Sequence, residues 1–149
     1  MTDTYEVIPF LDLALLHKPL KPAMLQVLSD ALDTSGFIGG KQVSLFEEEF
    51  AAFCGSPACA AVASGTDAVR LGLQGLGVGP GDTVVTVPNT FIATTEAISQ
   101  TGARFEFVDI DPATSLMDMN LLEERLKRSP RPKAVVPVHL YGQCVDMGA

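Results

Sequence analysis

The chain has 149 residues, of which 47% are hydrophobic and 19% charged, a composition typical of one globular domain and not of a disordered segment. Eighteen acidic against ten basic residues give a net charge of -8, which disfavours nucleic acid and anionic membrane surfaces as partners. The acidic start lacks the pattern of a signal peptide, and no apolar stretch approaches the ~20 residues that span a bilayer, so we expect a cytoplasmic protein.

Two amphipathic helices are predicted in the first third of the chain. The first begins near Pro22, a residue favoured in a first helical turn, and ends at Ser35-Gly36. The second ends at Gly55, which tolerates the left-handed backbone angles of a helix terminus. Its apolar stripe, which we interpret as core packing, consists of Val43, Phe46, Phe50 and Phe53.

Beyond these helices, strand-like and helical patterns alternate. Four short strands are predicted at Cys59–Ala63, Thr83–Val87, Arg104–Val108 and Ala134–Val138, and the helices between them at Thr66–Leu76, Phe91–Gln100 and Asp118–Lys127. The second and fourth strands are nearly continuous in valine, as in strands covered on both faces. This alternation predicts an α/β domain with a mainly parallel sheet between helices.

The junction at residues 62–68 is the first candidate site, because ligands of such sheets lie beyond the carboxyl ends of strands. Ser64, Gly65 and Thr66 are small, and the free amides of a first helical turn, together with the helix dipole, attract an anion. From spacing alone, ordinary helix capping by Ser64 or Thr66 is favoured over phosphate binding. We interpret Asp67 as a favourable first-turn charge and not as a catalytic acid.

Three later junctions also carry polar or aromatic residues. Phe91 could stack on a planar ligand, although an ordinary core phenylalanine is the simpler interpretation. Asp109-Ile110-Asp111-Pro112 is interpreted as a turn, and His139 as a structural histidine at a strand end. No metal-ligand spacing and no catalytic residue is predicted, and the missing glycine-rich dinucleotide loop disfavours a nucleotide-binding Rossmann domain.

Read together, four blocks of the chain resemble the DegT/DnrJ/StrS family of nucleotide-sugar aminotransferases, and they occur in the family's order. The blocks are residues 36–40 (Gly-Phe-Ile-Gly-Gly), 64–68 (Ser-Gly-Thr-Asp-Ala), 79–82 with 88–94, and 137–143 (Pro-Val-His-Leu-Tyr-Gly-Gln). The resemblance implies the large domain of a fold-type-I aminotransferase, a three-layer α/β/α arrangement around a mainly parallel sheet.

The resemblance also implies site residues and a cofactor. Gly65 and Thr66, with Ser64 adjacent, would bind the phosphate of pyridoxal 5'-phosphate (PLP), and Phe91 would lie over its pyridine ring. Phe37 and Ile38 would help to shape the substrate pocket of a second subunit, because the family builds each active site from two chains. A homodimer is therefore expected.

By the same resemblance, residues 1–149 correspond to an N-terminal segment and the first part of the PLP-binding large domain, and the rest of that domain and a C-terminal small domain are absent. The family's ring-nitrogen acid and its cofactor-linking lysine correspond to positions beyond Ala149, so the 149 residues alone are expected to be inactive. None of the chain's five lysines matches that lysine's motif; they are Lys18, Lys21, Lys41, Lys127 and Lys133.

For the full-length parent, the implied function is amino transfer, from glutamate as the expected donor, to a keto group of a nucleotide-diphosphate sugar. One alternative is a sugar dehydratase of the same family, in which histidine replaces the lysine. A second is a regulatory or truncated member that has kept the fold and lost catalysis.

Overall fold

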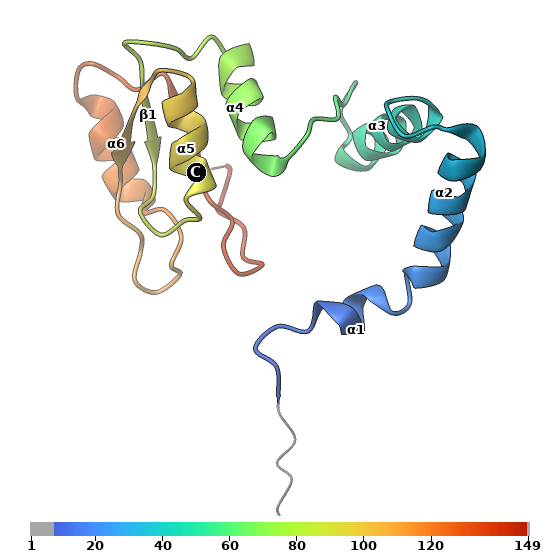
Figure 1. The fold of residues 1–149 in the computed structure, drawn as a ribbon. Helices are drawn as coiled ribbons and strands as arrows, with labels where there is room; N and C mark the ends of the chain where they lie inside the picture. The colour runs from blue at the N-terminus through green and yellow to red at the C-terminus, as the bar shows by residue number, and fades with distance from the viewer. Residues whose placement is uncertain (1–7, 149) are drawn as a thin grey trace, which may run out of the picture. The chain divides into compact units, whose positions relative to one another are not determined.

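The computed structural model describes residues 8–148, which divide into two compact units. The first extends to Ala61 and the second begins at Val62. Each unit is described by itself below, and Figure 1 shows the elements of both. Within residues 8–148 no helix is both long enough and apolar enough to cross a membrane.

The first unit consists of helices. Helix α1 (Leu13–His17) begins where the Asp12 carboxylate accepts a hydrogen bond of 3.0 Å from the Leu15 amide. Helix α2 (Lys21–Thr34) has proline in its first turn and ends at a left-handed Ser35, which confirms both predicted ends within a residue. Helix α3 (Lys41–Cys54) ends at left-handed Gly55, also as predicted.

The expectation that the aromatic stripe of α3 packs in a core is wrong for this unit. Phe46, Phe50 and Phe53 are 52%, 46% and 86% exposed, and Ala51 is the one buried residue of the helix. The rings contact one another instead: Phe46 and Phe50 stack with centroids 5.5 Å apart. The reason is that helices are the only regular elements among the described residues of the first unit, so no sheet covers the stripe.

The second unit alternates helices and strands. In chain order its elements are α4 (Gly65–Gly75), β1 (Thr83–Thr86), α5 (Ala93–Gln100), β2 (Arg104–Phe107), α6 (Met119–Lys127) and β3 (Ala134–Val135). The strands form a parallel sheet in the order β2-β1-β3, with Val84 opposite Phe105 on one side and Ala134 on the other. The predicted α/β class and parallel sheet are therefore confirmed.

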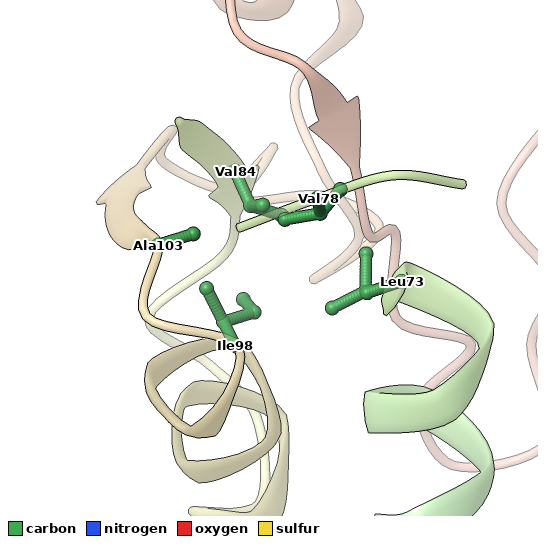
Figure 2. Close-up of a cluster of buried hydrophobic side chains, with 5 residues drawn as sticks. All are labelled: Leu73, Val78, Val84, Ile98 and Ala103. Carbon is green, nitrogen blue, oxygen red and sulfur yellow. The ribbon is translucent and has the colours of Figure 1, made fainter. Parts of the chain in front are cut away.

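Central strand β1 is buried on both faces and separates two apolar clusters. Val84 packs in one with Leu73 of α4 and Ile98 of α5, which Figure 2 shows pointing toward each other beneath the strand. Val85 packs in the other with Leu122 of α6. Because neighbouring side chains of a strand point to opposite faces, α4 and α5 cover one face and α6 covers the other (Figure 1). These are the three expected layers.

The strand expected at Cys59–Ala63 does not form. Those residues have no partner strand within residues 8–148, and the Ala61 amide donates instead to the Glu47 carboxylate at 2.7 Å. A run of small and apolar residues is compatible with a strand, but a strand also needs a neighbour for its backbone groups. The remaining three strands form, shorter than expected by one to three residues.

Candidate functional site

Two helices of the second unit, α4 and α5, begin at the same end of the sheet. The chain enters α4 at Gly65, returns through a turn to β1, and reverses again at the carboxyl end of β1 to enter α5 (Figure 1). The two helices pack against each other. Residues 64–66 and Phe91 therefore lie at the carboxyl end of the strands, where ligands of open α/β sheets bind.

Ser64 caps α4. Its backbone is extended, with φ of -159° and ψ of 166°, and its Oγ accepts a hydrogen bond of 3.1 Å from the Asp67 amide. The Ser64 carbonyl accepts the Ala68 amide at 3.0 Å. The capping interpretation is confirmed for Ser64, whose side chain is already engaged by the helix that it begins.

The backbone amides of Gly65 and Thr66, unlike that of Asp67, take no part in the Ser64 cap. Within residues 8–148 neither amide has a hydrogen-bond acceptor, as expected for the first two positions of a helix. Gly65 is exposed and Thr66 is half-buried. Capping and anion binding are thus compatible here, because they use different groups of the same turn.

Gly65 is not required by the fold. Its backbone lies outside the left-handed region, and a Cβ built on it would meet no atom within 4 Å. An alanine would fit and would favour the helix. The open space beside this glycine leaves room for a ligand to approach the backbone closely.

Phe91 lies in the turn that leads into α5, and its side chain is 76% exposed. The turn is held by the Thr90 amide, which donates to the Pro88 carbonyl at 3.0 Å, and by the Thr94 amide, which donates to the Phe91 carbonyl at 3.1 Å. The simpler interpretation, a core phenylalanine, is wrong. An exposed ring at the sheet's carboxyl end is free to contact a planar ligand.

Asp67 and Arg70 form an ion pair beside this turn. The guanidinium Nη2 and Nε lie 2.6 and 3.2 Å from Oδ1 of Asp67. The hydrogen bond from Arg70 lowers the pKa of the Asp67 carboxyl, so Asp67 is negatively charged at neutral pH. The interpretation of Asp67 as a first-turn charge agrees with this geometry. Arg70 was not singled out from the sequence, although its spacing of three residues from Asp67 carried the signal.

The other two junctions have structural roles in this unit. Asp111 Oδ1 accepts the amides of Ala113 and Thr114 at 2.6 and 3.3 Å, which confirms the predicted turn. His139 Nδ1 accepts the Val145 amide at 3.0 Å, which agrees with a structural histidine. Within residues 8–148 no cluster of His, Cys, Asp or Glu side chains has the arrangement of a metal site.

Phe37 and Ile38 belong to the first unit. They lie between α2 and α3 and are 61% and 97% exposed. The following Gly39 and Gly40 have φ of 63° and 81°, a left-handed turn that suits glycine. Two large apolar side chains are thereby held at the surface, and their part in a substrate pocket stays a prediction.

A parallel sheet with free amides at a helix start and an exposed aromatic ring beyond its strand ends defines a class of protein: α/β proteins whose ligands bind at the carboxyl edge of the sheet. Comparison with known proteins identifies the family within that class. The model of the DegT/DnrJ/EryC1/StrS aminotransferase family matches residues 19–149, and the chain belongs to this family.

Three similar proteins illustrate the relationship. The "Pleiotropic regulatory protein" of Geobacillus stearothermophilus is 41% identical over 95% of this chain and 38% of its own length. A dTDP-3-amino-3,4,6-trideoxy-alpha-D-glucose transaminase from Micromonospora megalomicea subsp. nigra is 46% identical over 85% of this chain and 33% of its own. The crystal structure of NtdA from Bacillus subtilis with bound cofactor PMP is 33% identical, with a TM-score of 0.86 over 98% of this chain and 34% of that one.

The chain thus spans between a third and two fifths of the length of these relatives. The similarity to a fold-type-I aminotransferase structure confirms the expected fold class, of which the chain contains a part.

Proposed function

We propose that the whole protein carrying this chain is a PLP-dependent enzyme that transfers an amino group to a keto group of a nucleotide-diphosphate sugar. The proposal is supported by family membership and by relatives that are named as transaminases of such sugars. The observation that carries it is local: two free amides and an exposed aromatic ring occur at one end of one sheet.

The residues present fit the cofactor. The Gly65 and Thr66 amides, with the α4 dipole behind them, would hold its phosphate, and the space beside Gly65 admits the phosphate oxygens. The Phe91 ring would cover one face of the pyridine ring. When bound, PLP supplies the electron-withdrawing ring on which amino transfer depends. The chain's own contribution is to bind and orient it.

Binding of two related compounds by the whole protein tests this assignment. Pyridoxamine 5'-phosphate and pyridoxamine differ by the phosphate, so the ratio of their dissociation constants isolates the phosphate site. We expect Phe91→Ala to weaken both compounds and to leave the ratio unchanged, because the ring contacts the part that they share. Equal affinities for the two compounds in the parent protein would contradict the assignment.

We propose glutamate as the amino donor, as the resemblance implies, and the reaction then yields 2-oxoglutarate and an aminated sugar in equal amounts. The assay mixes the whole protein with glutamate and dTDP- or UDP-linked 3-keto sugars and follows both products. Loss of keto sugar without formation of 2-oxoglutarate would point to the dehydratase alternative instead.

We further propose that the 149 residues alone do not catalyse this transfer. None of their lysines lies in residues 62–92, which form the candidate phosphate and ring contacts. In the second unit Lys127 is paired with Glu123 at 2.7 Å, and Lys133 directly precedes β3. Amino transfer by the purified 149-residue chain would refute this.

A second candidate function is regulation without catalysis, which the name of the relative from Geobacillus stearothermophilus favours. A whole protein that binds pyridoxamine 5'-phosphate but forms no aminated sugar from any keto sugar tested would support it.

For the catalytic form we propose a homodimer, with Phe37 and Ile38 facing the partner's substrate pocket. Light scattering gives the oligomeric state, and Ile38→Ser should raise KM for the sugar without changing cofactor affinity.

A further inference from the structure

The first turn of α4 combines two negative charges in the liganded state. Asp67 is the third residue of the helix and is ionised, and the proposed phosphate occupies the amides of the two residues before it. A helix N-terminus offers the equivalent of about half a positive charge, which two anions would have to share. An uncompensated Asp67 would therefore repel the ligand that this turn is proposed to bind.

Arg70 compensates that charge within the same helix. Its Nη2 and Nε both contact Oδ1 of Asp67, at 2.6 and 3.2 Å. The paired side chains are 28% and 31% exposed, so solvent screens them only in part. Nη1 also lies 3.5 Å from Oε1 of Gln74, one turn further along, which helps to keep the guanidinium on this face of the helix.

The pair also fixes the cap. Ser64 Oγ accepts the Asp67 amide at 3.1 Å and lies 3.4 Å from Oδ2 of the same residue. Arg70 holds one carboxylate oxygen and Ser64 faces the other, so the carboxylate is turned toward these two partners. The amides of Gly65 and Thr66 are left unoccupied.

We propose that Arg70 is a positioning residue of the phosphate site: it neutralises Asp67 and orients it, so that the start of α4 attracts the cofactor's phosphate. This inference rests on the proposed function. Arg70 acts through Asp67 and is not assigned a contact with the cofactor.

A double-mutant cycle on the whole protein tests the role, with pyridoxamine 5'-phosphate and pyridoxamine as ligands in calorimetric titrations. Arg70→Gln exposes the Asp67 charge and should weaken binding of the phosphorylated ligand by roughly twofold to fivefold, the typical range of charge effects at helix ends. The affinity for pyridoxamine should not change. The loss should shrink between 0.05 and 0.5 M salt, at about a threefold shorter Debye length.

The rescue variant makes the test specific. Asp67→Asn combined with Arg70→Gln should bind the phosphorylated ligand as the parent does, because neither charge remains. Asp67→Asn alone should bind it more tightly. Arg128→Gln is the matched control: it removes the same charge from the end of α6, on the opposite face of the sheet, and the Arg128 side chain is 71% exposed. That control should change neither affinity.

Two results would overturn the inference. If Arg70→Gln binds both ligands as the parent does, the pair has no influence on the phosphate. If the double variant binds as weakly as Arg70→Gln, with a lower melting temperature, the pair only stabilises the helix. The proposed function fails separately, when the parent protein itself does not distinguish the two ligands.

Discussion

Substitution of Gly65 by alanine separates what the fold needs from what a ligand needs. A Cβ at this position meets no atom within 4 Å, and the backbone angles already suit alanine. Alanine should therefore stabilise the folded state by about 0.5–1 kcal/mol, since it has less freedom to lose on folding. The same methyl group occupies the space in which a phosphate would reach the Gly65 amide.

The expected loss of affinity follows from the hydrogen bond that the methyl group displaces. A hydrogen bond to a charged group contributes about 1.5–3 kcal/mol, so losing one weakens binding by roughly tenfold to a hundredfold. The assay is calorimetric titration of the whole protein with pyridoxamine 5'-phosphate, with pyridoxamine as the reference ligand. The melting temperature of the unliganded protein is measured alongside.

Gly72→Ala is the matched control for this substitution. Gly72 lies two turns further along α4, has no atom within 4 Å of its Cβ position, and is exposed. It should raise stability by a similar amount and leave both affinities unchanged. If Gly65→Ala binds the phosphorylated ligand as tightly as Gly72→Ala does, the amides at the start of α4 do not hold a phosphate.

Three further predictions concern stability. Ile98→Ala should cost about 2–5 kcal/mol in denaturant unfolding, because Ile98 is fully buried between α5 and the sheet, and a cost below 1 kcal/mol would contradict that packing. Gly102→Ala should cost more than Gly77→Ala: both have positive φ, but only at Gly102 would a Cβ lie 2.8 Å from the Pro80 side chain, and equal costs would refute the contact. The hydrogen bond from Arg125 lowers the pKa of Glu106 below its ordinary 4.5. The pair therefore stabilises the folded state above pH 4.5, and this contribution is lost as the pH falls through the lowered pKa. Glu106→Gln should make the free energy of unfolding depend less on pH in that range.

Periodicity predicted most of the second unit, because its strands and helices are defined by local signals. The valines of β1 indicated burial on both faces, and glycine and proline marked the turns. Burial was harder to predict, since it depends on partners distant in sequence. The α3 stripe has the spacing of core residues, and Phe91 is of a residue type common in cores, yet both are exposed. Cys59–Ala63 lacks the neighbour that would make it a strand.

In the candidate site too, local sequence signals predicted some features and missed others. Capping by Ser64 could be predicted from residue type alone, as a preference of helix starts. The phosphate assignment could not, because spacing favoured a simple cap and the family resemblance reversed that preference. Arg70 was missed because a single arginine on a helix surface is common, and its contact with Asp67 becomes meaningful only when the neighbouring amides are seen to be free.

The order of strands has a consequence for synthesis on the ribosome. Central strand β1 precedes both of its neighbours in the chain: Thr83 pairs with Arg104, and Val84 also pairs with Ala134, fifty residues later. When β1 has just emerged from the ribosome, its valines have neither β2 nor β3 beside them, because both strands are synthesised later. At roughly 5–20 residues per second this interval lasts seconds, long enough for a chaperone to meet the exposed segment.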